Sequence, residues 1–163
     1  METIIIDAYN LMHKVTELRV LLAQSQEICV DTMIQKIRSH YHGRSTKCIL
    51  VFDGFGQNKH EANINVKFSN TGVGPDYGNA DGLIKHLIEK SRNPKLIKVV
   101  SSDREVSSFA KECGSRILSS ESFWGEVKDR RVERSEAIRE SNEKPAVVTR
   151  GEFEFLLKEF TKK

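Results

Sequence analysis

The sequence predicts an α/β fold in which helices cover both faces of a mainly parallel central sheet. Short apolar runs alternate along the chain with segments of helical periodicity, the arrangement typical of such a sheet. The apolar runs are continuous rather than alternating, which indicates strands that are buried on both faces. The chain has 163 residues, of which 38% are hydrophobic, and this fits one ordinary domain with its own core.

Three of the predicted strands have a common design, a buried run that leads into an aspartate. The first run ends at Asp7, the second at Asp53, and the third passes through two serines to Asp103. A fourth run alternates with a period of two residues, which predicts a more exposed strand, and a fifth candidate is short. The predicted strands are 3–6, 48–52, 64–68, 96–100 and 116–118.

Helical periods occupy the intervals between these runs. One apolar face spans residues 83–88 and ends before Pro94, and another spans residues 106–113 and ends at Gly114. Residues 16–42 form a long helical stretch, whole or broken, with an incomplete apolar stripe. These helices are expected to cover the sheet.

The composition changes after residue 124. Residues 126–144 are dense in charge and nearly lack large apolar side chains, whereas residues 153–160 show one apolar helical face. We therefore divide the chain into a domain over residues 1–124 and a charged helical extension over residues 125–163, which ends in a short amphipathic helix. That helix packs either on its own domain, the alternative we favour, or on a second subunit as part of a homodimer.

Composition excludes several classes of protein. No apolar run reaches the roughly 18–20 residues that span a bilayer, and Asp7 interrupts the first apolar run too early for a signal peptide, so we expect a cytoplasmic protein without membrane contact. Three cysteines without CxxC spacing favour neither a disulfide framework nor a thiolate metal site. The formal net charge of +3 permits a polyanionic ligand without requiring one.

The aspartates at the strand ends are the candidate functional site. Because the carboxyl ends of parallel strands meet at one edge of a sheet, Asp7, Asp53 and Asp103 are expected to lie close together. Asp81, at the start of a predicted helix, is placed to reach the same edge. Clustered carboxylates repel one another unless cations neutralise them, and oxygen ligands suit Mg²⁺ or Mn²⁺. The alternative for each aspartate by itself is a helix cap or a turn.

Further polar residues are candidates around these acids. Asn10 is placed to orient a metal-bound water or Asp7, and the alternative is a local turn hydrogen bond. The Ser102 hydroxyl is a candidate to hold a carboxylate or a phosphate. Tyr77, in a turn-rich loop before Asp81, is a candidate to stack on a base, with simple exposure as an equal alternative. The candidate phosphate contacts include Lys59 and Arg104, although solvated surface charge is the commoner role of such residues.

Four sequence blocks resemble the NYN domains, and among them the YacP-like branch, which are relatives of the PIN and FLAP nucleases. The blocks are Ile4 to Leu11, Val51 to Gly54, Ala80 to Ile84 and Val100 to Asp103, and the resemblance covers about residues 2–124. It implies a PIN-like three-layer α/β/α domain with an acidic site that uses Mg²⁺ or Mn²⁺ to hydrolyse RNA phosphodiesters. The metal-site acids that it implies are Asp7, Asp53, Asp81 and Asp103, with Asn10 in the first motif.

The function that we expect is a metal-dependent endoribonuclease that cleaves RNA by a two-metal-ion mechanism and leaves 5′-phosphate and 3′-hydroxyl ends. The expected catalytic residues are Asp7, Asn10, Asp81 and Asp103; the expected substrate contacts are Ser102, Arg104, Tyr77 and Lys59. Expected partners are RNA, single-stranded or structured, and as a further candidate the ribosome, with the protein acting as a monomer or as a homodimer through its C-terminal helix.

A non-catalytic module that binds RNA or the ribosome is the alternative. YacP-like sequences usually carry a second acid directly after the aspartate of the third motif, where this chain has Gly82, and Asp76 is the acid placed to compensate. Two other enzyme classes fit poorly. A haloacid-dehalogenase phosphatase needs an aspartate where Tyr9 stands, and a dinucleotide-binding fold needs a glycine-rich turn after its first strand.

Overall fold

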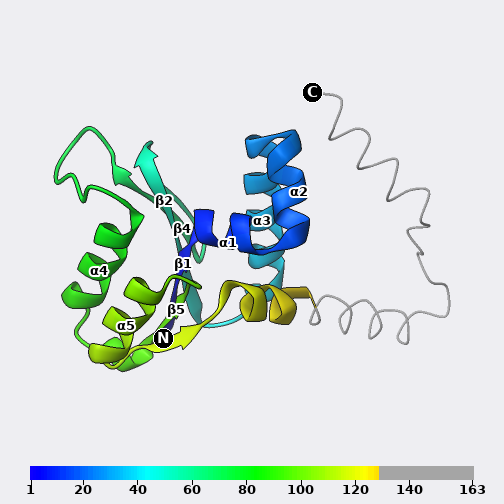
Figure 1. The fold of residues 1–163 in the computed structure, drawn as a ribbon. Helices are drawn as coiled ribbons and strands as arrows, with labels where there is room; N and C mark the ends of the chain where they lie inside the picture. The colour runs from blue at the N-terminus through cyan, green and yellow to red at the C-terminus, as the bar shows by residue number, and fades with distance from the viewer. Residues whose placement is uncertain (129–163) are drawn as a thin grey trace, which may run out of the picture.

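The computed structural model describes residues 1–128, and these form a six-stranded sheet with helices on both faces (Figure 1). The strand order is β3-β4-β2-β1-β5-β6, and every neighbouring pair is parallel except β3 with β4. The predicted α/β fold with a mainly parallel sheet is therefore confirmed. The strands are β1 (Glu2–Asp7), β2 (Thr46–Phe55), β3 (Lys59–Glu61), β4 (Ile64–Asn70), β5 (Ile97–Val100) and β6 (Arg116–Leu118).

The central strand β1 explains why its sequence is apolar throughout. It lies between β2 and β5, and its three isoleucines are at most 1% exposed because helices cover both of its faces. Two details differ from the prediction. Strand β2 continues past Asp53 to Phe55, with a shift in register after Phe52, and the short edge strand β3 was not predicted. All residues of β3 are exposed, so it carries no apolar signal.

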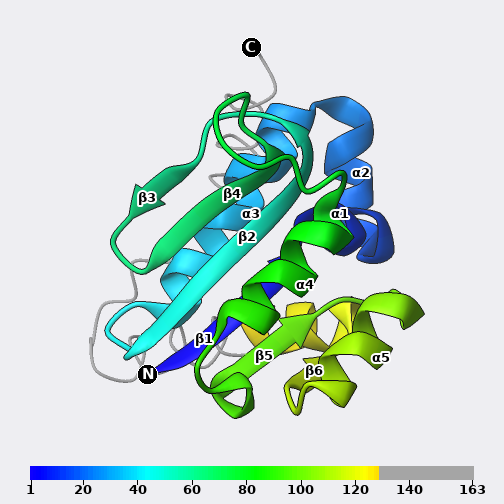
Figure 2. The same cartoon turned by 90° about the vertical axis from the view of Figure 1, so that its left-hand side faces the viewer.

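The helices lie in two groups. On one face are α1 (Ala8–Lys14), α2 (Thr16–Gln24) and α3 (Gln26–Tyr41), joined by a helical segment over residues 120–128; on the other are α4 (Ala80–Lys90) and α5 (Arg104–Glu112) (Figures 1 and 2). A single 3₁₀ turn, η1 (Pro94–Leu96), precedes β5. The stretch predicted over 16–42 is broken at Ser25, whose hydroxyl accepts the Ile28 N–H at 3.3 Å and caps α3. None of the helices within residues 1–128 is long and apolar enough to cross a membrane.

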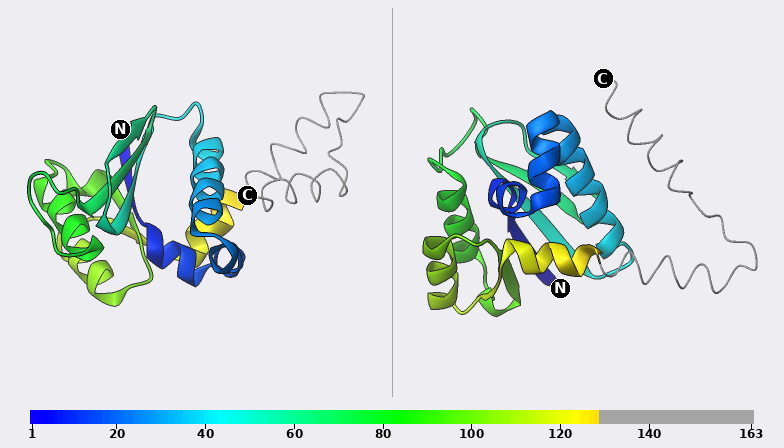
Figure 3. Two further views of the ribbon diagram at one scale, coloured as in Figure 1. Left: turned by 90° about the horizontal axis from the view of Figure 1, so that it is seen from above. Right: turned by 45° about the vertical axis from the view of Figure 1, so that its right-hand side comes forward.

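Each face of the sheet has its own apolar core. Alternation along β1 sends Ile4 and Ile6 into the core with α1 to α3, and Ile5 into the core with α4 and α5. The segment 120–128, yellow in Figure 3, packs with α3, and its Phe123 and Val127 belong to the first core. The helical segment 120–128 therefore crosses the domain boundary that the sequence analysis placed at residue 124. The division into two parts stays a prediction. The predicted amphipathic helix at 153–160 lies outside the described residues and also stays a prediction.

The topology creates one functional edge. Strands β1, β2, β4 and β5 are parallel, so their carboxyl ends lie along the same side of the sheet. Helix α1 begins directly after β1, and α5 begins four residues after the end of β5. The loop 71–79 leads from β4 to the start of α4. The starts of three helices and the ends of four strands therefore converge where the sequence places its aspartates.

Candidate functional site

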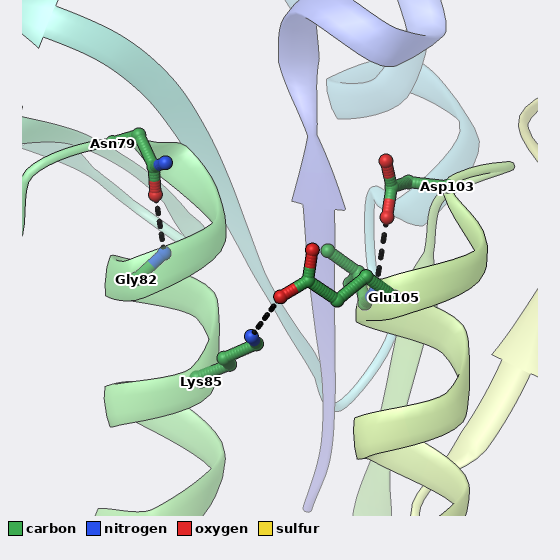
Figure 4. Close-up of polar contacts among 6 residues, drawn as sticks. Asn79, Gly82, Lys85, Asp103 and Glu105 are labelled. Carbon is green, nitrogen blue, oxygen red and sulfur yellow. Dashed lines mark hydrogen bonds and ion pairs between the residues drawn. The ribbon is translucent and has the colours of Figure 1, made fainter.

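Asp7 and Asp103 both cap helices at this edge. Asp7 is the last residue of β1, and its carboxylate accepts the Asn10 N–H at 3.4 Å at the start of α1. Asp103 accepts the Val106 N–H at 3.0 Å at the start of α5 (Figure 4). Capping and clustering, which the sequence offered as alternatives, are therefore combined in these two residues. Since β1 and β5 are neighbours, both carboxylates lie at this edge of the sheet, and that of Asp103 contributes to the raised pKa of Asp7.

Asp81 lies in the first turn of α4, but it is not the cap. That role belongs to Asn79, whose side chain accepts the Gly82 N–H at 2.8 Å (Figure 4). The pKa of Asp81 is raised, first by burial and then by the carboxylates of Asp103, Glu105 and Asp53, with Lys85 acting in the opposite direction. Helices α4 and α5 are bridged by an ion pair of 2.8 Å between Lys85 and Glu105, which joins the helix carrying Asp81 to the helix capped by Asp103.

Asp7 is the most strongly perturbed of these acids. Its side chain is 6% exposed, and burial raises its pKa from 3.8 to about 6. The carboxylates of Asp81 and Asp103 contribute to this rise in pKa, and the hydrogen bonds from the Asn10 N–H and the Ser101 hydroxyl act against it. Asp7, Asp81 and Asp103 are therefore close enough to repel one another, whereas the exposed Asp53 contributes to the raised pKa of Asp81 but not to that of Asp7.

Two serines that the sequence did not single out bind these acids. The Ser101 hydroxyl donates to Asp7 at 3.3 Å and accepts the Asp103 N–H at 3.1 Å. On the other side of the edge, the buried Ser69 hydroxyl donates to Asp53 at 3.4 Å and accepts the Gly54 N–H at 2.9 Å. The only sequence signal for Ser101 was its place between a strand end and Asp103, and that signal pointed equally to Ser102.

Asn10 and Ser102 belong to a network that holds the site together. The Asn10 side-chain oxygen accepts the Ser102 N–H at 2.9 Å and the Ser120 hydroxyl at 2.8 Å. The Ser102 hydroxyl in turn donates to Glu121 at 2.8 Å and accepts the Ser120 N–H at 3.1 Å. These contacts tie α1 and the loop after β5 to the segment 120–128. The side chains of Asn10 and Ser102 therefore hold these three segments in place relative to one another.

The three remaining predicted residues lie in different places. Arg104 is the exposed first residue of α5, directly after Asp103. Tyr77 lies in the loop before α4, with its ring 4.8 Å from that of His86, and it packs against the core on the α4 side. Lys59 is exposed on the edge strand β3 opposite Val66, away from the carboxyl end of β4. Only Arg104 of the three adjoins an acid of the site directly in the chain.

Gly82, the departure from the family pattern, has a steric cause in this fold. A Cβ atom at this position would overlap the carbonyl oxygen of Tyr77, because the loop passes close to the start of α4. Asp76, the acid that was expected to compensate, accepts the Gly78 N–H at 2.8 Å and the Asn70 amide at 3.4 Å. The contacts of Asp76 therefore shape the loop.

The donor set fits a hard divalent cation that keeps part of its hydration shell. Within residues 1–128, no three histidine, cysteine, aspartate or glutamate side chains form a preformed metal cage. Mg²⁺ commonly binds through one or two carboxylates, several waters and substrate phosphates, so such a cage is not required. Burial first, and then the neighbouring carboxylates of Asp81 and Asp103, raise the pKa of Asp7, and a cation at this edge would favour its ionised form.

Comparison with known proteins places this geometry in context. The family described as the YacP-like NYN domain matches residues 4–154. The crystal structure of Rae1 (YacP) from Bacillus subtilis is 25% identical, with a TM-score of 0.66, and the match covers 99% of this chain and 94% of that chain. A mutant of the same protein gives a TM-score of 0.68 at 25% identity, covering 91% and 88%. No curated protein sequence matches. The likeness confirms the expected PIN-like fold.

Proposed function

The chain belongs to the YacP-like NYN domain family, a PIN-like nuclease family, and from this premise we propose that it is a Mg²⁺- or Mn²⁺-dependent endoribonuclease. The observation that carries the proposal is the buried carboxyl of Asp7, with its pKa raised to about 6 beside Asp81 and Asp103. An ionised carboxylate that is buried and lies near other acids opposes folding, and groups perturbed in this way are concentrated at functional sites. The acids that would hold metal are Asp7, Asp53, Asp81 and Asp103.

Each residue at the edge has a distinct role in the proposed reaction. A bound divalent cation would supply a water of lowered pKa and neutralise charge on the phosphodiester. Ser101 orients the carboxylate of Asp7, and Ser69 orients that of Asp53. Asn10 and Ser102 keep the loop that carries Asp103 in register with α1. No side chain of the protein is needed as a nucleophile.

RNA is the proposed substrate. Arg104 presents an exposed cation next to Asp103, where it can contact a phosphate close to the scissile bond. Phe55, two residues after Asp53, is 74% exposed at the end of β2 and offers an aromatic face to an unpaired base. The sequence analysis did not identify Phe55 as a candidate RNA contact. Tyr77 and Lys59 are proposed to contact the RNA strand farther from the scissile bond.

The competing proposal is a PIN-like module that binds RNA without cleaving it. The specific observation in its favour is Gly82, which leaves the third motif with one acid where related sequences usually have two. Loss of one carboxylate would weaken metal binding while leaving the overall fold and the exposed cations intact. The two proposals differ in whether Asp7 is needed for metal binding and cleavage.

Metal titration of an Asp7→Asn variant separates these proposals. In the wild type, Mn²⁺ is expected to raise the melting temperature and support cleavage of an RNA strand to products with 5′-phosphate and 3′-hydroxyl ends. Asp7→Asn is expected to lose both effects. The control is Asp31→Asn, which changes an exposed acid on α3 and should keep both.

Unchanged cleavage by Asp7→Asn would contradict the nuclease proposal. RNA binding without cleavage by the wild type in Mn²⁺ would favour the module. Action on the ribosome, a cytoplasmic location and dimerisation through the helix at 153–160 remain predictions, and residues 129–163 lie outside the described structure.

A further inference from the structure

A pocket lies beside the acidic edge, between α4 and β4. Its cavity holds about 150 Å³ and is partly open to solvent. Its walls come from β4, the loop 71–77 and the face of α4 that carries His86 and Lys90. Figure 2 shows this side of the molecule, where α4 lies in front of β1 while β4 and β3 have no helix in front of them.

The pocket is basic. Lys67 of β4 and Lys90 at the end of α4 both line it, together with His86. The pKa of Lys67 is lowered, first by burial and then by the ammonium groups of Lys47 and Lys90. Among the ion pairs within residues 1–128, none includes any of these three lysines. Within residues 1–128, the two lysines of the pocket, Lys67 and Lys90, therefore have no ion-paired carboxylate, and Lys47 adds positive charge from outside the pocket, an arrangement that an anion would stabilise.

Residues of the pocket neighbour residues of the acidic edge on both walls. Lys67 and Ser69 point to the same face of β4, two residues or about 7 Å apart, and Ser69 is the residue that hydrogen-bonds Asp53. On the other wall, Tyr77 and Leu83 of the pocket lie on either side of Asp81 in the sequence. A strand bound at the aspartates can therefore extend into the pocket without leaving the surface.

We propose that this pocket is a subsite for the RNA strand on one side of the scissile bond, where Lys67 and Lys90 bind phosphate groups and the paired rings of Tyr77 and His86 form the wall next to a base. The inference rests on the proposed nuclease function and assigns a substrate path to it. Lysine binds phosphate as a mobile point charge, and its contacts with a phosphate backbone are independent of sequence. A free nucleotide has the same phosphate chemistry and must be distinguished by experiment.

Binding measured without divalent metal tests the subsite independently of cleavage. The full chain in EDTA is titrated into a fluorescently labelled single-stranded oligoribonucleotide at several salt concentrations. A Lys67→Gln/Lys90→Gln double variant is expected to bind about tenfold more weakly, with a slope of log affinity against log salt that is shallower by about 1.4, since each phosphate contact in a single strand contributes about 0.7. The control is Lys95→Gln/Lys111→Gln, two exposed lysines outside the pocket, which should change affinity less than twofold.

An unchanged affinity and salt slope in the double variant, or an equal loss in the control pair, would overturn the subsite. Thermal unfolding serves as the check on folding, because removing unpaired like charges is expected to leave the melting temperature unchanged or higher. Competition with 5′-AMP distinguishes the two sources of phosphate. Displacement of the oligoribonucleotide by AMP at equal concentration would assign the pocket to a free nucleotide and contradict the RNA path.

Cleavage in Mn²⁺ tests the nuclease proposal, and RNA binding by the double variant tests the subsite, so the two proposals can fail independently. Cleavage by the wild type in Mn²⁺ together with undiminished RNA binding by the double variant would refute the subsite and leave the nuclease intact. Absence of cleavage together with lysine-dependent RNA binding would support the subsite and refute the nuclease.

Discussion

The hydroxyl of Ser101 donates a hydrogen bond of 3.3 Å to the carboxylate of Asp7, although 94 positions separate the two residues in the chain. The pairing of Ile6 with Val100 in the parallel strands β1 and β5 places the next residue of each strand at the same edge. The same hydroxyl accepts the Asp103 N–H at 3.1 Å. One serine therefore fixes the positions of two acids of the proposed metal site.

Replacement of Asp7 by asparagine is expected to stabilise the metal-free protein at neutral pH. Its folded pKa of about 6 exceeds the ordinary value of 3.8, so the folded state binds the proton more tightly, and stability falls as pH rises from about 4 to 6. At pH 7.5 in EDTA, Asp7→Asn should be more stable by about 3 kcal/mol, since the pKa of Asp7 is raised by about two units and one unit corresponds to about 1.4 kcal/mol. Urea unfolding measures this difference.

The two proteins should converge in stability as the pH falls to about 3, below both the folded and the unfolded pKa, because Asp7 is then largely protonated in both states. Asp31→Asn, at an exposed position on α3, should remain within about 0.5 kcal/mol of the wild type at both pH values. If the wild type were more stable than Asp7→Asn at pH 7.5, the raised pKa of Asp7 in the folded protein would be contradicted.

Asn10→Ala is expected to lower both stability and cleavage. It removes the acceptor of the Ser102 N–H and of the Ser120 hydroxyl, and Ser120 is fully buried. An unpaired buried donor costs about 1–3 kcal/mol. Displacement of the loop after β5 would also move Asp103. Denaturant unfolding and cleavage rates measure the two effects.

Ser120→Ala provides the comparison, because it removes one hydroxyl donor and leaves the bond between Asn10 and the Ser102 N–H intact. Its loss of stability should be smaller than that of Asn10→Ala. Equal stability of Asn10→Ala and the wild type would show that the network does not hold the loop.

Gly82→Ala is expected to destabilise the protein, although alanine normally favours a helix over glycine. The added Cβ would overlap the carbonyl oxygen of Tyr77, so the loop before α4 has to move, at a cost of about 1–3 kcal/mol. Gly125→Ala is the matched control, because no atom lies within 4 Å of a Cβ built at this helical position. It should gain about 0.5–1 kcal/mol. If thermal unfolding showed that both variants are stabilised, or that both are destabilised, the close approach between residue 82 and the Tyr77 carbonyl would be contradicted.

The fold was largely predictable because its central strands carry strong local signals. Buried on both faces, β1 and β2 must be apolar throughout, and such runs are visible without coordinates. Strand β3 was missed because it is short and exposed and exists only through its pairing with β4. The break at Ser25 was left open, since the same residue type serves as a cap or as an ordinary helix residue.

The position of these acids at one edge of the sheet was predictable for a topological reason, whereas their role in metal binding stays a prediction. Parallel strands end at one edge, so an aspartate at the end of each apolar run is placed near the others by the chain order alone. The partners of these acids were not predictable. Ser101 and Ser102 are adjacent in the sequence, but they differ in whether they face Asp7 or Glu121, and only the packing of the loop decides this.

The sequence by itself determined the sheet, the edge and the family, because strand burial and capping leave residue patterns that can be read within a few positions. The tertiary structure decided the raised pKa of Asp7, the hydrogen-bond network around Asn10 and the basic pocket of Lys67 and Lys90. These features depend on charges and hydrogen bonds between residues that are distant in the chain, and their energies are set by separation in space and by burial.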